Sequence, residues 1–192
     1  MRIENKNDCI NAGKLAARLG LTVHQSLLER RIRKLMLAYP SSQSASPEDW
    51  LMDVAHARGA RVVRRMDADK ADFAAPAPDV FPNEELVVAI CQLQREDQPQ
   101  RLRLAAQLVS RGAVKVDRLL LLARRERAEV VLGELARQAL KVEPGHGVWQ
   151  RIADAFPPRR ALRSPIAHWQ RLAWPVMMGG HRVNAQRWEL VR

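Results

Sequence analysis

The signals that start and stop helices divide most of this chain into helical segments, and they constrain its fold more than any other feature. Residues 12–38 read as helical with an interruption at Gly20, and the serine-rich residues 39–45 indicate a loop. Residues 46–49 have the order of an N-cap, a proline at the first helical position and an acidic residue at the third. A helix is therefore expected to begin there and to end near Gly59.

Helix start and stop signals continue through the second half of the chain. Asn83 can cap a helix, another helix follows Pro99 and stops near Gly112, and a short one is expected at 147–156. Residues 115–142 read either as one long helix or as two helices with a break near Arg125 that makes a helical hairpin. Two glycines at 179–180 lie between extended-looking segments, which predicts a small β-hairpin near the C-terminus.

These segments predict a mainly α protein, built as a helical bundle or as stacked helical hairpins with a small C-terminal β-hairpin. The apolar residues are mostly Ala, Leu and Val rather than aromatic, which is typical of helices packing on helices. Three closely spaced prolines indicate a linker at 76–82. The expected organisation is an N-terminal helical domain at 1–75, this linker, a helical core at 83–156 and a basic, tryptophan-containing segment at 157–192.

The chain is strongly basic, with 32 Lys and Arg against 21 Asp and Glu, a net charge of +11 and a sequence pI near 10.9. Arginine supplies 26 of the cations, and the last 42 residues hold eight cations and two anions. A GC-rich genome produces such a bias through codon usage. The functional interpretation is that the planar guanidinium groups of arginine bind phosphates or carboxylates through paired hydrogen bonds. The charge thus predicts an anionic partner, either nucleic acid or an acidic protein surface.

Residues 15–22 carry the small residue, the turn glycine and the apolar flanks of a helix-turn-helix, in Ala16, Gly20, Leu15, Leu19 and Leu21. Thr22 can cap a second helix with a basic face. Residues 12–36 therefore resemble the DNA-binding motif of bacterial helix-turn-helix regulators. The chain departs from that pattern at Ser26, where the family has an apolar residue, and an ordinary helical hairpin is the alternative interpretation.

The resemblance implies a set of nucleic-acid-binding residues in the second helix. The first residues of this helix would contact base edges, and they are His24, Gln25 and Ser26. Phosphates would be met by the cations that follow, which are Arg30, Arg31, Arg33 and Lys34. The alternative for these cations is a solvated helix face opposite Leu28 and Ile32.

Two further basic groups are candidates for nucleic-acid contact. The first is the run Arg124, Arg125 and Arg127. The second is the tail, where arginines could hold phosphates and an indole could stack on a base: Arg159, Arg160, Arg163, Arg171, Trp174, Arg182 and Arg187. The tail tryptophans could equally form the core of a small subdomain or a protein interface.

No nucleotide-binding loop, metalloprotease signature or serine-hydrolase motif occurs in the sequence, and two cysteines are too few for a zinc site. We therefore expect no enzyme, no cofactor and no metal. No apolar run approaches the roughly 18 residues of a membrane span, so a cytoplasmic protein is expected. The sequence favours a non-catalytic nucleic-acid-binding accessory or regulatory protein, of bacterial type. The alternative is a helical adaptor or scaffold subunit of a larger protein complex.

Overall fold

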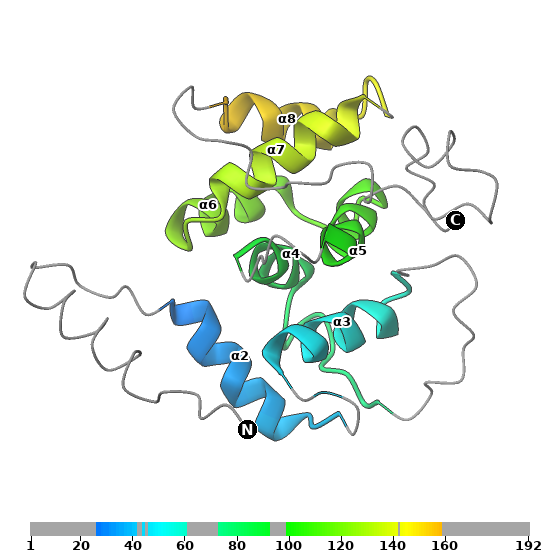
Figure 1. Cartoon of the computed structure of the whole chain (residues 1–192), viewed down its shortest axis with the longest axis vertical. Helices are drawn as coiled ribbons and strands as arrows, with labels where there is room; N and C mark the ends of the chain where they lie inside the picture. The colour runs from blue at the N-terminus through cyan, green and yellow to red at the C-terminus, as the bar shows by residue number, and fades with distance from the viewer. Residues whose placement is uncertain are drawn as a thin grey trace, which may run out of the picture.

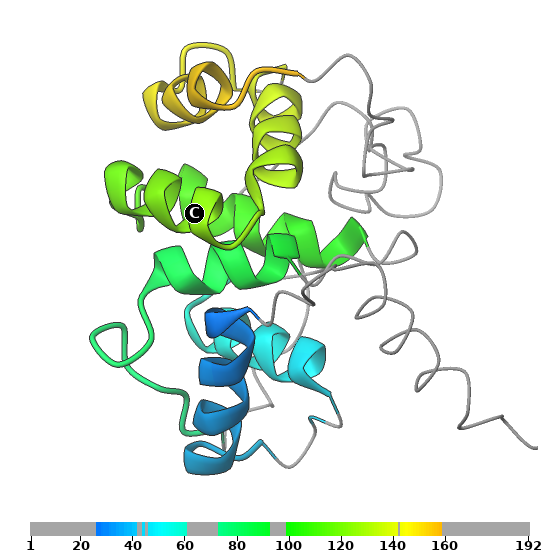
Figure 2. The same cartoon turned by 90° about the vertical axis from the view of Figure 1, so that its left-hand side faces the viewer.

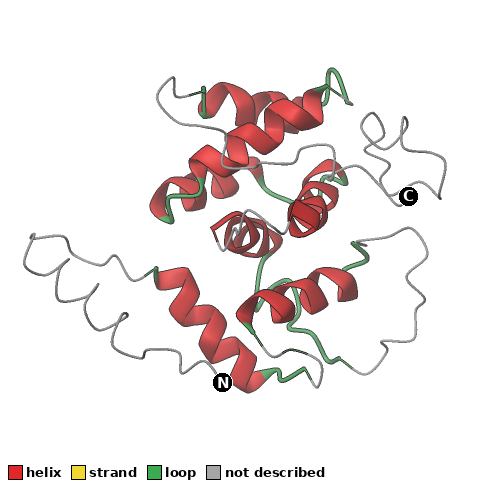
Figure 3. Cartoon of the chain, viewed as in Figure 1, coloured by secondary structure: helices red, strands yellow, loops and turns green. Residues whose placement is uncertain are grey.

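The computed structural model describes residues 26–41, 44, 46–60, 73–92, 99–141 and 143–158. In these residues the regular secondary structure is entirely helical, joined by loops and turns (Figures 1 and 3). The helices are α2 (Leu27–Ala38), α3 (Pro47–Ala57), α4 (Asn83–Gln92), α5 (Pro99–Ser110), α6 (Val116–Arg125), α7 (Glu129–Leu140) and α8 (Gly147–Ala155). The mainly helical class is confirmed, whereas the predicted β-hairpin lies outside the described residues.

Helix α3 begins as its sequence predicts. The Ser46 side chain accepts a hydrogen bond from the backbone N–H of Asp49 at 3.2 Å, and Pro47 occupies the first turn. The helix ends at Ala57, and the chain turns away two residues later at Gly59, whose φ of +85° lies in the left-handed region that an L side chain adopts only with strain. The next residue, Ala60, donates its N–H back to Ala55 O at 3.0 Å, which completes a Schellman cap.

Two helix starts differ from the prediction. Ser26 caps α2 by accepting from Glu29 N at 3.1 Å, so this helix begins at Leu27 and not after Thr22. Asn83 lies inside α4, and its side chain accepts from Arg58 and donates to Ala113 O at 2.9 Å. A polar side chain near a helix start can satisfy either its own helix or a neighbour, and the tertiary contacts decide which.

The region 115–142 breaks after Arg125, which decides between the two sequence interpretations. Arg127 has a φ of +57°, and Ala128 donates its N–H to Ala123 O at 2.8 Å. This is again a Schellman cap, with arginine where glycine is usual. Ala128 is the residue before α7 and is only 1% exposed, so the turn also buries its methyl group.

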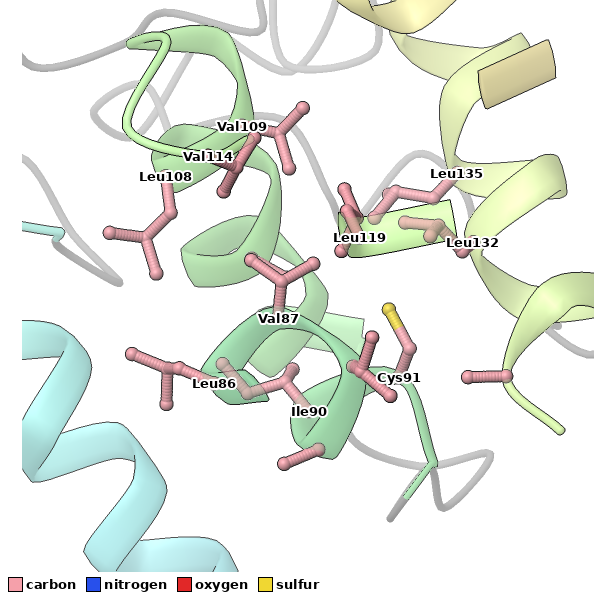
Figure 4. Packing of buried hydrophobic residues seen from close by; sticks show 14 of the residues in the cluster. Leu86, Val87, Ile90, Cys91, Leu108, Val109, Val114, Leu119, Leu132 and Leu135 are labelled. Carbon is pink, nitrogen blue, oxygen red and sulfur yellow. The ribbon is translucent and has the colours of Figure 1, made fainter. Parts of the chain in front are cut away.

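Helix α4 occupies the centre of the described structure, between α2 and α3 on one side and α6 to α8 on the other (Figures 1 and 2). Its residues Leu86–Cys91 are all buried, which a helix achieves only when others surround it. Val87 and Cys91 lie on the side of α4 that faces Leu119 of α6 and Leu132 of α7, whereas Leu86 lies on the side nearer α3 (Figure 4). One buried cluster includes residues from each of the helices α2 to α8.

The proline-rich segment predicted as a linker is itself packed. Pro76 and Pro82 are buried, and the Arg58 guanidinium donates to Pro76 O and Phe81 O while lying 5.7 Å from the centre of the Phe81 ring. Burial lowers the pKa of Arg58, against the opposing charge of Glu84. The core cluster contains residues from both sides of this segment.

The contact between α7 and α8 depends on Gly133. A Cβ atom there would lie 2.7 Å from both Cβ and the carbonyl oxygen of Phe156, and the backbone oxygen cannot rotate away. We expect Gly133→Ala to lower the free energy of unfolding by about 1–3 kcal/mol through overpacking. Denaturant unfolding followed by circular dichroism measures this change.

Gly147→Ala is the matched control, because nothing lies within 4 Å of a Cβ at that position in α8. It is expected to raise the stability by about 0.5 kcal/mol through the lower entropy of the unfolded chain. Equal effects of the two substitutions would contradict the close approach of α7 and α8.

Candidate functional site

A buried carboxylate near the start of α4 gathers two arginines from other helices. Glu85 Oε1 accepts a hydrogen bond from Arg31 Nη1 of α2 at 3.0 Å and from Arg118 Nη2 of α6 at 3.3 Å. The Glu85 side chain is 5% exposed, whereas each arginine side chain is 46% exposed. Arg31 also donates from Nη2 to Val80 O at 2.6 Å. The site therefore has its anion inside and its cations at the surface.

The far end of α4 holds the first turn of α2 against the turn after α6. The Ser26 hydroxyl lies 2.6 Å from Glu126 Oε2 and 3.2 Å from Gln92 Oε1. Gln92 Nε2 donates to Glu126 O at 3.1 Å, and Arg125 Nε donates to Glu126 Oε1 at 3.0 Å. Residues 100 positions apart in the sequence are joined here directly.

The Glu126 carboxylate is held in its charged form. Burial by itself raises the pKa of Glu126, but hydrogen bonds from Ser26 and Arg125, the charge of Arg125 and a backbone hydrogen bond at Leu28 outweigh it. The net effect lowers the pKa below its ordinary value. An ionised Glu126 therefore fixes both the cap of α2 and the Arg125 guanidinium.

We name Arg31, Arg118 and Arg125 the arginine cluster. Arg118 and Arg125 are seven positions apart on α6, so they lie on one stripe of that helix, with Leu121 between them. The Arg125 side chain is 52% exposed and Leu121 is 67% exposed. Two buried carboxylates balance three guanidinium groups, which leaves the cluster with a net positive charge.

Arg30 and Arg127 neighbour the arginine cluster in sequence and are exposed. Arg30 directly precedes Arg31 in α2, and Arg127 follows the Arg125–Glu126 pair. Among the described residues, neither has a carboxylate within ion-pair distance. Their charge is therefore available to an anionic partner.

The other predicted residues within the described part are distributed differently. Arg33 pairs with Glu29 of its own helix at 2.6 Å, and Lys34 is exposed. Arg124 lies 5.3 Å from the centre of the Phe156 ring, so it turns toward α8 rather than toward α2. Ser26 is 7% exposed, and its hydroxyl is engaged by protein groups.

Several predicted residues lie outside the described part, and their role stays a prediction. They are His24, Gln25, Arg159, Arg160, Arg163, Arg171, Trp174, Arg182 and Arg187. The helix-turn-helix resemblance extends over residues 12–36, of which only 26–36 are described.

Sequence reasoning missed Arg118 and both organising carboxylates. Arg118 could have been found from its spacing to Arg125, because seven residues return to the same side of a helix. Glu85 reads in the sequence as an acidic residue that favours the start of α4. Its burial follows only from the packing of α2 and α6 around it, and so does that of Glu126.

Partly buried polar side chains near α8 are engaged in structural contacts. His146 accepts from Trp149 N at its Nδ1, which caps α8, and its Nε2 lies 3.1 Å from Ser110 O. Ser110 Oγ donates to Glu143 at 2.8 Å and accepts from Trp149 Nε1 at 2.8 Å. The Ser110 hydroxyl is thus engaged by Glu143 and Trp149.

Burial raises the pKa of Cys91 to about 12, which keeps it a thiol. Among the described residues, no group of three His, Cys, Asp or Glu side chains is arranged to hold a metal ion. Within that same part of the chain, no helix has the length and hydropathy to span a lipid bilayer.

Comparisons with protein-family models, with curated proteins and with solved structures gave no match.

The Glu126 contacts generate a prediction about acid stability. A carboxyl group whose pKa is lowered in the folded state stabilises that state fully above its unfolded pKa. The contribution disappears as the pH falls through the folded pKa. We expect Glu126→Gln to lower the free energy of unfolding by about 1–3 kcal/mol at neutral pH. The difference from the wild type should shrink below the ordinary pKa of 4.5.

Denaturant unfolding at a series of pH values from neutral to acidic measures this difference. The control is Glu29→Gln, which removes an exposed pair with Arg33 and should change stability by less than about 1 kcal/mol. A gap between wild type and Glu126→Gln that stays constant across the acidic range would show that the charge of Glu126 has no role.

Proposed function

We propose that this chain is a non-catalytic nucleic-acid-binding protein that contacts the phosphate backbone through the arginine cluster with Arg30 and Arg127. The observation that supports it most is that Arg31 and Arg118, from two helices, both bind the buried Glu85 carboxylate, and that Arg125 is held by the buried Glu126 carboxylate. Each guanidinium is fixed at its inner edge, and about half of each side chain remains exposed. Such groups are oriented before any partner arrives, which reduces the entropy lost on binding.

Phosphate is the anion that this arrangement suits. Arginine presents several N–H donors in one plane, and it binds phosphate oxygens in pairs. The carboxylates that orient the cluster are too deeply buried to compete at the surface, since the Glu85 and Glu126 side chains are 5% and 1% exposed. Contacts of this kind carry affinity rather than sequence specificity. The proposal is therefore one of backbone binding.

A helical adaptor is the second candidate, and one observation favours it. Leu121 and Leu27 are 67% and 54% exposed, and Leu121 lies between two arginines of α6. Apolar and arginine side chains together are common in protein interfaces. In this alternative the arginine cluster meets an acidic protein surface, and polynucleotide binding is weak at every salt concentration.

Binding of the full chain to a fluorescein-labelled RNA or DNA oligonucleotide tests the proposal by fluorescence anisotropy. Between about 50 and about 300 mM salt, affinity should fall steeply, because each neutralised phosphate releases a counterion. Replacing Arg30 and Arg127 together with Gln is expected to reduce the slope of log affinity against log salt by about two.

The matched control is the double replacement Arg33→Gln with Arg151→Gln. Both are exposed arginines that pair with a carboxylate, Glu29 and Asp117 respectively, and the charge removed is the same. This control should leave the slope within error of the wild type. Absence of binding at about 50 mM salt would contradict the proposal and favour the adaptor.

A further inference from the structure

Two adjacent carboxylates are buried in the first turn of α4: Glu84 accepts from the backbone N–H of Lys115 at 2.6 Å, whereas Glu85 accepts from arginine side chains of two other helices. The residues that follow it, Leu86–Cys91, are all buried and apolar. One carboxylate oxygen, Oε1, receives both guanidinium groups, while Oε2 is buried and has no hydrogen-bond partner in the described structure. A buried carboxylate with an unpaired oxygen is unfavourable for stability. The side-chain contacts that Glu85 does make are with Arg31 and Arg118.

The geometry around Oε1 sets the separation of the two guanidinium groups. Two nitrogens bonded to the same oxygen lie within about 6 Å of each other. A single phosphate can reach both, because its two non-bridging oxygens each accept a hydrogen bond of about 2.8 Å. Arg31 is further fixed by its 2.6 Å hydrogen bond to Val80 O, so one side of the pair is anchored at two points.

Charge and unused donors agree with this ligand. Two arginines and one carboxylate leave one positive charge, and a phosphodiester carries one negative charge. Arg118 uses only Nη2 in the contacts described, so most of its N–H donors are available at the surface. Both side chains are 46% exposed, which leaves room for an oxygen ligand on the outer side.

We infer that Arg31 and Arg118, positioned by Glu85, form a clamp for one phosphodiester group of a bound polynucleotide. The inference rests on the proposed function and deepens it by naming the contact. Arg31 and Arg118 touch the phosphate, and Glu85 is a positioning residue that acts through them. The clamp joins α2 to α6, so it exists only in the folded chain.

Lysine substitutions test the clamp, because lysine keeps the charge but lacks the planar fork. In the anisotropy assay with the full chain at about 100 mM salt, Arg31→Lys and Arg118→Lys should each weaken binding about fivefold or more. The double variant should bind about as weakly as either single variant, since both groups hold the same phosphate. The control Arg33→Lys, on α2 but outside the clamp, should stay within about twofold of the wild type.

Glu85→Gln separates positioning from overall charge. The substitution makes the chain more positive by one, so binding governed by net charge would become tighter. The clamp predicts weaker binding, because a neutral amide holds the two guanidiniums less firmly than a carboxylate. Circular dichroism checks that this variant folds, and the lysine variants, being at half-exposed positions, decide the matter if it does not.

The outcomes separate the two proposals. If the wild type fails to bind any oligonucleotide at about 50 mM salt, the nucleic-acid function and the clamp are both overturned. If the wild type binds but the lysine variants match Arg33→Lys, the clamp alone is overturned. Tighter binding by Glu85→Gln would also refute the clamp while leaving nucleic-acid binding intact.

Discussion

The helix Asn83–Gln92 has to be surrounded by other helices, because the side chains of Leu86–Cys91 are apolar on every side of it and would otherwise contact water. This need brings helices from both ends of the described chain against α4, and the buried cluster that results is continuous. Burial of apolar area provides the favourable free energy, and it does not depend on direction. The positions of the neighbouring helices are fixed by the polar groups at the two ends of α4.

Those polar ends connect stability with the candidate site. At one end of α4, Glu85 contacts Arg31 of α2 and Arg118 of α6, and Glu84 accepts from the backbone N–H of Lys115 at the start of α6. At the other end, Gln92 contacts Ser26 and Glu126, which flank α2 and α6. A fully apolar α4 would leave the guanidinium groups of Arg31 and Arg118 without their carboxylate partner. Buried polar groups that are fully bonded define one arrangement among many apolar ones. Glu85 Oε2, by contrast, is buried without a hydrogen-bond partner among the described residues.

The candidate site was only partly predictable. Arginine runs in the sequence identified Arg31 and Arg125, but they also included Arg33 and Arg124, which contact Glu29 and Phe156 instead. The direction of a side chain depends on its helix phase and on what lies opposite. The helix phase can be counted from the sequence. What lies opposite a side chain depends on the packing of segments that are up to 100 residues apart in the sequence.

By itself the sequence determined the helical class, most helix boundaries and the basic character of the chain. Caps, glycine stops and apolar spacing act within a few residues, so they can be read locally. Only the tertiary structure decided that α6 and α7 separate at Arg127 and that Glu85 is buried. It also decided which arginines come together. These depend on contacts between segments distant in the sequence, where burial and charge pairing outweigh local propensity.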